Sequence, residues 1–386
     1  MSLLTRKLKK TSPEDVAAVV HGSGQFAMDL YQQLSSGQGS FFFSPFSIST
    51  SLAMAYAVSA GRTQAQMAQA LHFPLVQEQL HPAFSYLDAA VGQAAEEGGV
   101  QLRVANSLWP QKGQKLLKEF TTLLRKAYGV RINPVDFAEA EEVRLKINAW
   151  VEDKTESKIK DLIAPGVLDS LTRLVLANAI YFYGDWLNKF DPNLTAEAPF
   201  YGTAREGVVQ MMGQRGTFRY GEWDGLQAIE LPYTGDGVSM LVLLPAAQDG
   251  LAALEGSLTS GNLEAWIAGL AEAEVDLFLP KFELSSAFRL DDALRSLGME
   301  DTFTHQADFS GMNGLQDLFI SAALHKAFIS VNEEGTEAAA ASAVVMTLKS
   351  VPFPAVVFRA DHPFLFLIRE KTTGSILFLG SFMDPA

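Results

Sequence analysis

The chain has 386 residues, of which 48% are hydrophobic and 19% are charged, and it contains no cysteine. This composition is typical of a globular protein with a large core, and it excludes a disordered, collagen-like or coiled-coil chain. The 30 Lys and Arg residues against 44 Asp and Glu residues give a formal net charge of -14, which disfavours nucleic acid as a partner.

Targeting and linker signals are sparse. The basic N-terminus is not followed by the apolar stretch of a secretory signal, and no apolar run approaches the length of a bilayer span. The lack of cysteine fits a reducing compartment and equally a secreted protein with a sufficient core. We therefore expect a soluble protein, secreted or periplasmic if a signal was removed and otherwise cytoplasmic. Since no linker or internal repeat divides the sequence, we expect one domain over residues 1–386.

Helix signals dominate the first half of the chain. Ser12, followed by Pro13 and two acids, is a typical N-cap, and Ser44 before Pro45 is another. Hydrophobic spacing then predicts a first helix to Leu34, a short strand over Phe41–Phe43, a buried second helix to Gly61 and an amphipathic surface helix over Val143–Ile163.

Strand signals dominate the second half. Several runs there are rich in β-branched, aromatic and Leu residues, which favour strands. They are Leu174–Phe182, Ser239–Leu244, Glu274–Leu279, Phe328–Val331, Ala355–Phe358, Phe364–Ile368 and Ile376–Phe382. Helices followed by strands indicate an α+β protein with large antiparallel or mixed sheets.

Sequence motifs for catalysis or metal binding are absent. We find no nucleophile elbow, phosphate-binding loop, zinc-protease helix or dinucleotide-binding turn. No pair of the six histidines has metal-ligand spacing; they are His21, His72, His81, His305, His325 and His362. We therefore expect a protein that is not an enzyme and has no metal site and no cofactor. A catalytic triad assembled from distant residues is the alternative that spacing leaves open.

The segment from Glu333 to Phe358 has no single local preference. Four alanines at positions 338–341 favour helix, valines at 344 and 345 favour strand, and prolines at 352 and 354 impose extended backbone. Alternate residues of 336–342 are small and would share one face of a strand. Such a strand could enter an existing sheet. The alternative is an Ala-rich surface helix followed by a proline-containing loop.

One stretch that overlaps the start of this segment, Val-Asn-Glu-Glu-Gly-Thr-Glu-Ala-Ala-Ala-Ala, begins at Val331 and is accompanied by other distinctive runs. These include Phe-Phe-Ser-Pro-Phe-Ser-Ile from Phe42, Asn-Ala-Ile-Tyr-Phe-Tyr-Gly-Asp-Trp from Asn178, Leu-Pro-Lys-Phe from Leu279, His-Lys-Ala from His325 and the C-terminal run from His362 to Pro385. In this order and over nearly the whole chain, they resemble the signatures of the serpins, the superfamily of serine protease inhibitors.

The resemblance implies a fold and a function. The fold is α+β, with several helices around three β-sheets and a large central sheet able to accept the reactive loop as an extra strand. The implied function is that of a serine-type endopeptidase inhibitor acting as a suicide substrate. A protease cleaves the exposed loop, about residues 335–357, and stays attached as an acyl complex while the freed loop inserts.

The hinge of that loop is of the type found in inhibitory serpins. It carries no proline and no bulky residue, whereas members that have lost inhibition typically carry bulky, charged or proline residues there. The residues that match the hinge are Glu333, Glu334, Gly335, Thr336, Glu337, Ala338, Ala339, Ala340 and Ala341.

The family's spacing also places the reactive bond, which follows the seventeenth residue counted from the hinge glutamate matching Glu333. This count ends at Lys349, so we expect cleavage between Lys349 and Ser350 by a trypsin-like protease with a carboxylate in its specificity pocket. Loop lengths vary by about a residue, and Leu348 or Met346 would instead suit a chymotrypsin-, elastase- or subtilisin-like enzyme.

The resemblance also implies two clusters of residues at the central sheet. The shutter, a cluster under the central sheet where the strands must part, is matched by Ser44, Ser47, Asn178 and His325. The breach, where the loop first enters, is matched by Trp186, Lys281 and Glu333, with an ion pair expected between the last two. Judged from the residues alone, each of these polar residues would more often be a helix cap or a locally satisfied core group.

Departures from the family pattern concern structure and partners. Ser40 stands where serpins usually have Asn, and Ser381 stands where a basic residue usually follows Phe-Leu-Gly. The basic helix that binds heparin in some animal serpins has no counterpart, because residues 63–102 contain neither Lys nor Arg. We expect a monomer whose partner is a target protease, without heparin or membrane, from a microbial source. The alternative from another class is a non-inhibitory serpin serving as a binding protein or chaperone.

Overall fold

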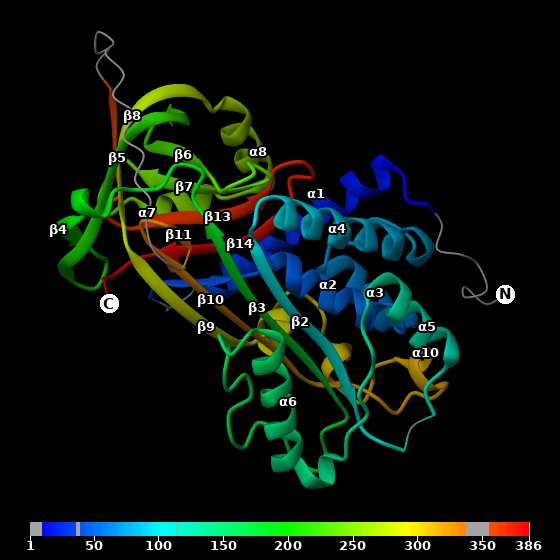
Figure 1. The fold of residues 1–386 in the computed structure, drawn as a ribbon. Helices are drawn as coiled ribbons and strands as arrows, with labels where there is room; N and C mark the ends of the chain where they lie inside the picture. The colour runs from blue at the N-terminus through cyan, green and yellow to red at the C-terminus, as the bar shows by residue number, and fades with distance from the viewer. Residues whose placement is uncertain (1–9, 36–38, 114, 337–354, 386) are drawn as a thin grey trace.

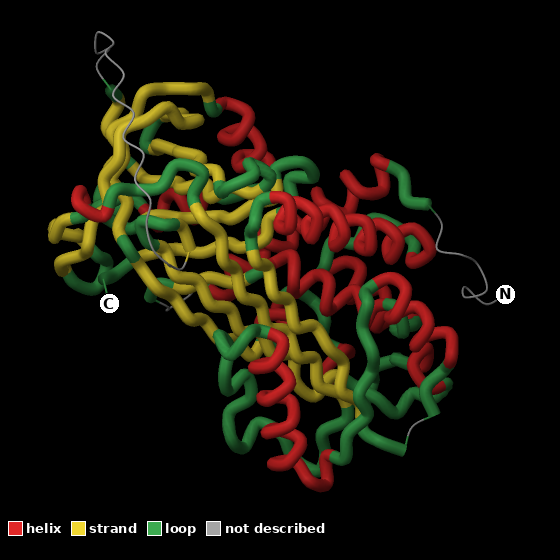
Figure 2. Tube along the Cα trace, viewed as in Figure 1, coloured by secondary structure: helices red, strands yellow, loops and turns green. Residues whose placement is uncertain are grey.

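The computed structural model describes residues 10–35, 39–113, 115–336 and 355–385. Helices from the N-terminal part of the chain lie together on one side of it, and strands make up most of the other side (Figures 1 and 2). The α-helices are α1 (Pro13–Leu34), α2 (Pro45–Tyr56), α3 (Gly61–Ala70), α4 (Gln77–Glu97), α5 (Lys118–Ala127), α6 (Ala140–Lys154), α7 (Leu251–Ser257), α8 (Ser260–Gly269), α9 (Asp291–Ser296) and α10 (Ser310–Asn313). Short 3-10 turns cover Phe137–Glu139, Pro192–Leu194 and Asp301–Phe303.

The strands follow the same chain order. They are β1 (Phe41–Phe43), β2 (Gln101–Pro110), β3 (Leu174–Asp185), β4 (Ala196–Tyr201), β5 (Glu206–Trp223), β6 (Leu226–Pro232), β7 (Val238–Pro245), β8 (Ala271–Pro280), β9 (Phe282–Arg289), β10 (Ile320–Val331), β11 (Gly335–Thr336), β12 (Val356–Arg359), β13 (Phe364–Glu370) and β14 (Ile376–Phe382).

These strands form two sheets in the part of the chain that the structure describes. The central sheet has five strands, with β3 paired to β2 on one side and parallel to β10 on the other, β9 beside β10, and the short β11 against the end of β3. The second sheet has nine strands in the order β1-β14-β13-β7-β6-β5-β8-β12, with β4 on β5. The α+β serpin fold is confirmed, but the expected three sheets appear as two, because β5 is long enough to pair with both β8 and β6.

Both predicted N-caps are present. The Ser12 side chain accepts a hydrogen bond from the backbone N–H of Asp15 at 3.1 Å, and the Ser44 side chain accepts one from that of Ser47 at the same distance. Because each cap satisfies an N–H that has no partner within its helix, it fixes where the helix begins. The second of these helices, α2, is buried along its whole length and runs below the central sheet.

Two predicted helix ends are wrong. The second helix ends at Tyr56 rather than Gly61, and Gly61, with φ of +54°, instead begins the separate helix α3. The predicted surface helix over Val143–Ile163 covers only Ala140–Lys154, because the Thr155 hydroxyl bonds the carbonyl of Val151 and the next residues turn away with positive φ. Local hydrophobic spacing continued past both ends, so it did not reveal them.

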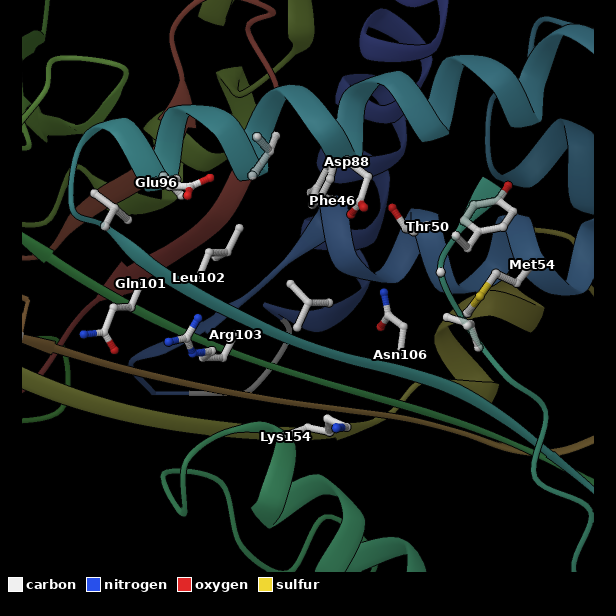
Figure 3. A pocket seen from close by; sticks show the side chains of 18 of the residues that line it. Phe46, Thr50, Met54, Asp88, Glu96, Gln101, Leu102, Arg103, Asn106 and Lys154 are labelled. Carbon is white, nitrogen blue, oxygen red and sulfur yellow. The ribbon is translucent and has the colours of Figure 1, made fainter. Parts of the chain in front are cut away.

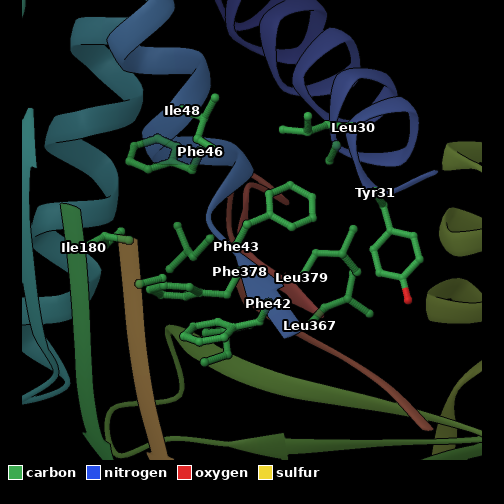
Figure 4. Close-up of a cluster of buried hydrophobic side chains, with 14 of the residues drawn as sticks. Leu30, Tyr31, Phe42, Phe43, Phe46, Ile48, Ile180, Leu367, Phe378 and Leu379 are labelled. Atoms are coloured by element: carbon green, nitrogen blue, oxygen red, sulfur yellow. The ribbon is translucent and has the colours of Figure 1, made fainter. Parts of the chain in front are cut away.

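The core explains why the sequence is so rich in phenylalanine. Phe42 is fully buried, and its ring centroid lies 5.9 Å from that of Phe378 and 6.3 Å from that of Phe366 (Figure 4). These rings tie β1 to β13 and β14 beneath α1 and α2. The Tyr31 ring of α1 lies 5.1 Å from that of Phe41 on β1, so aromatic packing also joins a helix to the nine-stranded sheet.

Strand β3 is buried on both faces. Leu176, Ile180 and Phe182 belong to the core shared with α2, whereas Ala177 and Ala179 pack with the residues of α6. Because side chains alternate along a strand, every second residue of β3 points toward α2. Asn178 is therefore directed at the N-terminus of that helix. None of the described helices has the length and apolarity needed to cross a membrane.

We expect Phe378→Ala to lower the free energy of unfolding by about 3 to 5 kcal/mol, because it empties a site packed against the rings of Phe42 and Phe182. Tyr86→Ala is the matched control: it removes a ring that is 51% exposed, and we expect a change of about 0.5 kcal/mol or less. Urea unfolding followed by tryptophan fluorescence measures both variants. Equal effects of the two substitutions would contradict this description of the core.

Candidate functional site

The four residues that match the shutter come together in one hydrogen-bonded cluster between α2 and the central sheet. The Ser44 backbone N–H donates to Nε2 of His325 at 3.1 Å, and the Nδ1 of that ring bonds Oδ1 of Asn178. The Asn178 amide nitrogen donates to the Ser47 hydroxyl at 2.6 Å. One cluster therefore connects the N-terminus of α2 with β3 and β10.

The bonds of His325 fix its tautomer. Nε2 accepts from a backbone N–H, so the ring proton resides on Nδ1 and is donated to the amide oxygen of Asn178. The residue is fully buried, and burial lowers the pKa of His325 to about 3. The ring of Phe288 on β9 lies parallel to it, with centroids 6.4 Å apart. The histidine is therefore neutral in the folded protein at ordinary pH.

Sequence reasoning missed a further member of the cluster, Asn106 on β2. Its Oδ1 accepts hydrogen bonds from Asn178 and, at 3.3 Å, from the Ser47 hydroxyl. Asn106 lies opposite Asn178 in the β2–β3 register, and Asn178 lies opposite His325 in the β3–β10 register. Since β2 also contains Gln101, Arg103 and Ser107, no local signal in the sequence distinguishes Asn106. The cluster thus crosses three adjacent strands.

The three residues that match the breach also lie close together, at the C-terminal, or upper, end of β3. Lys281 Nζ forms the expected ion pair with Glu333 Oε2 at 2.8 Å, and the Thr195 hydroxyl donates to the same carboxylate at 2.8 Å. Burial acts to raise the pKa of Glu333, but these hydrogen bonds outweigh it and hold the pKa below its usual value. The indole N–H of Trp186 donates to the carbonyl of Asn332 at 2.9 Å.

A second ion pair, not foreseen from the sequence, holds the next hinge residue. Lys189 Nζ lies 2.5 Å from Glu334 Oε2 and 3.2 Å from Asp185 Oδ2. The backbone contributes as well, because the N–H of Trp186 donates to the carbonyl of Glu334, and that of Phe190 donates to the carbonyl of Glu333, both at 2.9 Å. Both hinge glutamates are therefore bound through side chain and backbone.

Beyond these glutamates the chain reverses direction at Gly335. This residue has φ of +152°, and a Cβ atom there would lie 2.1 Å from the carbonyl oxygen of Gly184. Only glycine fits this conformation and this close approach. The reversal brings Gly335 and Thr336 into antiparallel pairing with Asp185 and Gly184, beyond the last β3–β10 pair at Tyr181 and Phe328.

The rest of the expected loop lies outside the described residues. This holds for the hinge residues Glu337, Ala338, Ala339, Ala340 and Ala341 and for the candidate reactive residues Met346, Leu348, Lys349 and Ser350. Below the hinge, β3 and β10 are hydrogen-bonded directly to each other from Leu174 to Tyr181. No other strand lies between them along that length.

The two departures from the family pattern lie near the C-terminus. The Ser40 hydroxyl accepts hydrogen bonds from the backbone N–H groups of Met383 and Asp384, at 2.8 and 3.2 Å. Serine therefore anchors the C-terminal segment at this position. Ser381 is fully buried on β14, between Phe41 of β1 and Leu365 of β13.

Comparisons with known proteins agree with this geometry. The family model described as Serpin (serine protease inhibitor) matches residues 21–385. The leukocyte elastase inhibitor of Homo sapiens is 42% identical over 374 residues, which cover 94% of this chain and 98% of that protein. Ipis-1 of Ixodes persulcatus is 43% identical over 369 residues, which cover 93% of this chain and 97% of that protein.

Solved structures give the same result. Uncleaved ovalbumin superposes with a TM-score of 0.85 at 28% identity, covering 95% of this chain and all of that one. Maspin superposes with a TM-score of 0.88 at 29% identity, covering 96% of this chain and all of that one. The chain belongs to the serpin family, whose matching model describes its members as serine protease inhibitors.

Two expectations change with these findings. The expected microbial source has no support, because the similar proteins include those of Homo sapiens and Ixodes persulcatus. The expectation that the chain is not an enzyme was drawn from missing motifs, but missing motifs do not decide whether a chain is an enzyme. The family description, which is that of protease inhibitors, replaces it as the basis for the functional class.

We expect acid to weaken the folded protein through His325. Because its pKa is about 3 when folded and about 6.5 when unfolded, the unfolded chain binds the proton first, and stability falls as pH drops below 6.5. His325→Asn removes this component, so the difference in unfolding free energy between wild type and variant should narrow by about 2 kcal/mol from pH 7.5 to pH 5.

Urea unfolding at both pH values measures this change. The control is His21→Asn, since the His21 side chain is 55% exposed, and it should leave the wild-type pH curve unchanged. A gap between wild type and His325→Asn that stays constant with pH would show that the buried histidine does not set the acid sensitivity.

Proposed function

We propose that this serpin is inhibitory and traps its target as a covalent acyl complex, by inserting residues 336–347 between β3 and β10. The observation that carries the proposal is the direction of β11. Since Gly335 and Thr336 already run antiparallel to β3 at its upper end, a strand continued from them would extend along β3 toward Leu174. The position it would take is the seam between β3 and β10.

The dimensions of the seam support this insertion. Strands β3 and β10 have 12 residues each, and residues 336–347 form a stretch of the same length, about 40 Å at 3.3 Å per residue. A new strand there would find hydrogen-bond partners on both sides. At about 1 kcal/mol net for each new bond, insertion would release on the order of 10 kcal/mol, comparable to the whole stability of a domain.

The chemical steps are those of an interrupted serine protease reaction. The protease serine attacks the carbonyl carbon of the bait residue, the bond to the next residue breaks, and its nitrogen leaves as an amine after taking a proton from the catalytic histidine. An ester then joins inhibitor and protease. Insertion carries this ester away from the loop's starting position, which distorts the protease before water can hydrolyse the bond.

We assign to the polar cluster the role of holding β3 and β10 together along the seam. The hydrogen bond between Asn178 and His325 joins the two strands that must separate, so insertion has to break it. Ser44 and Ser47 hold the cluster to α2, and their partners are buried. Breaking such bonds without replacement costs about 1 to 3 kcal/mol for each buried group, which opposes opening before cleavage.

The ion pairs at the hinge have a different role. Lys281 and Lys189 hold Glu333 and Glu334 at the top of the seam, and their side chains are about two-fifths exposed. Exposed pairs contribute about 1 kcal/mol or less to stability. We therefore assign them to positioning the hinge so that Gly335 points the following residues at the seam.

We propose Lys349–Ser350 as the reactive bond and a trypsin-like protease as the target. A second candidate is an elastase- or chymotrypsin-like target, with Met346 or Leu348 as the bait residue. The names of the similar proteins favour this second candidate, because several of them are leukocyte elastase inhibitors. The two candidates share the trapping mechanism and differ only in the bond that is cleaved.

Mixing the protein with trypsin should give a complex stable in denaturing detergent and a C-terminal peptide beginning at Ser350. Lys349→Ala should abolish the trypsin complex, because the specificity pocket loses its cation. Lys118→Ala, a change of an exposed lysine on α5, is the control and should leave the complex intact. Gel electrophoresis with mass spectrometry of the released peptide measures both outcomes.

Chymotrypsin, elastase and subtilisin belong in the same experiment. A complex with one of them and a peptide beginning at Thr347 or Lys349 would keep the mechanism and replace the proposed bond by the second candidate. Cleavage by all four proteases with no complex and full remaining protease activity would overturn the inhibitory proposal and favour a non-inhibitory serpin.

Ala340→Pro should convert the protein from inhibitor into substrate. Proline has no N–H to give to the sheet, so residues 336–347 could not form a regular central strand, while the exposed bond would still be cleaved. We expect the trapped fraction to fall to about a tenth or less of wild type. Ala340→Ser keeps a small side chain and an N–H, and it should trap normally. Equal trapping by both variants would show that insertion is not required.

A further inference from the structure

His81 is a buried histidine that neither the polar cluster nor the proposed protease trapping uses. It lies on the second turn of α4 and is 2% exposed. Its Nδ1 is 2.6 Å from the hydroxyl of Tyr128, the residue that follows α5, and the two ring centroids are 5.9 Å apart. This pair is therefore a polar contact between α4 and the end of α5.

The other nitrogen of the ring has no partner. Nε2 of His81 is buried and forms no hydrogen bond within the described part of the chain. A neutral imidazole can bear this, because its one proton can reside on Nδ1 and be donated to the Tyr128 oxygen, with only a lone pair on Nε2. The phenol stays neutral, since burial raises the pKa of Tyr128. A second proton on the imidazole would leave a charged N–H buried without an acceptor, which is strongly unfavourable.

The groups around His81 offer no compensating charge. α2 contributes the phenol of Tyr56, whose ring centroid lies 6.5 Å away, and α5 contributes Arg125 and Lys126 in its last turn, which have the charge of a protonated histidine. On α4 itself, Asp88 lies about two turns further along, is exposed, and forms no ion pair with His81 among the described residues. Burial therefore dominates, and it lowers the pKa of His81 to about 4.

The end of α5 is held by few other contacts. This helix buries only Phe120, Leu124 and Ala127, and neither α4 nor α5 has a side-chain hydrogen bond at its N-cap. Residues 128–131 line a cavity of about 980 Å³ that lies between α4, β2 and α2, so there is empty space beside them (Figure 3). Short helices with few buried contacts open at a lower free energy than the whole domain.

We propose that mild acid detaches α5 and residues 128–131 from α4 by protonating His81, while the two sheets stay folded. In the opened state the imidazole reaches water, so it can hold the second proton that the closed contact excludes. Opening therefore becomes easier as pH falls below about 6.5, and it stops responding to pH below about 4. This response is separate from that of His325, which concerns unfolding of the whole chain, and it does not depend on protease trapping.

Hydrogen exchange, followed peptide by peptide in the whole protein, tests the proposal. After correction for the intrinsic pH dependence of exchange, the protection of residues 118–131 should fall about 30-fold between pH 7.5 and pH 5, because the opened state binds the proton and the closed state does not. Amides of β3 should stay better protected than those of α5 at both pH values. Equal protection of α5 and β3 would show that α5 opens only with the whole protein, and it would overturn the proposal.

His81→Asn identifies the group that titrates. Asparagine can still hydrogen-bond the Tyr128 hydroxyl but takes up no proton, so the protection of residues 118–131 should be nearly the same at pH 7.5 and pH 5. His21→Asn is the matched control, because the His21 side chain is 55% exposed, and it should keep the about 30-fold change. A pH response in His81→Asn as large as in wild type would show that His81 is not its source.

A second variant keeps the test decisive if His81→Asn does not fold. Tyr128→Phe removes the hydrogen bond but keeps the buried histidine, so residues 118–131 should lose several-fold in protection at pH 7.5 and lose more at pH 5. Unchanged protection in this variant at pH 7.5 would show that the contact does not hold α5 to α4, and the proposal would fail on that result alone.

Discussion

The hydrogen bonds of the Asn178 side chain hold three strands of the central sheet and helix α2 together. Its amide oxygen accepts a hydrogen bond from Nδ1–H of His325 across the seam, and its amide nitrogen donates hydrogen bonds to the Ser47 hydroxyl and to Oδ1 of Asn106 on the neighbouring strand. An amide is the one kind of side chain that can do all of this at once, since it accepts through oxygen and donates through nitrogen. His325 is neutral because burial disfavours the charged ring and lowers its pKa to about 3.

The seam between β3 and β10 has two regions, a lower one in which the strands are paired and an upper one in which they part. Below Tyr181 and Phe328 the strands β3 and β10 are bonded to each other, and the polar cluster lies three residues inside that paired region. Above it they part, and Gly335 turns the chain back into the opening. The polar cluster and Gly335, where the proposed insertion would start, are thus about 20 Å apart along one strand, at 3.3 Å per residue. In the proposed mechanism, opening at the top need not disturb the cluster at first.

The sequence predicts local features well and long-range ones less well. Ser12 and Ser44 cap helices because a cap is a property of four consecutive residues. The long strand β5 went unpredicted, because glycines and charged residues interrupt its alternation, and pairing with β8 rather than propensity makes it a strand. Asn106 was missed for a similar reason, since only the register of β2 and β3 brings it to the cluster.

The site residues that were predicted came from motifs, and the structure explains why motifs suffice there. Gly335 has to be glycine because a Cβ would collide with the backbone of β3, and Asn178 has to donate and accept at once. Replacing either residue would disturb the backbone or the hydrogen bonds of β3 itself. The bait residue has no such constraint from the fold, since specificity depends on the pocket of another protein. In the proposed mechanism the hinge and the polar cluster belong to the fold, whereas the residue proposed as bait, at position 349, would set the target without changing either.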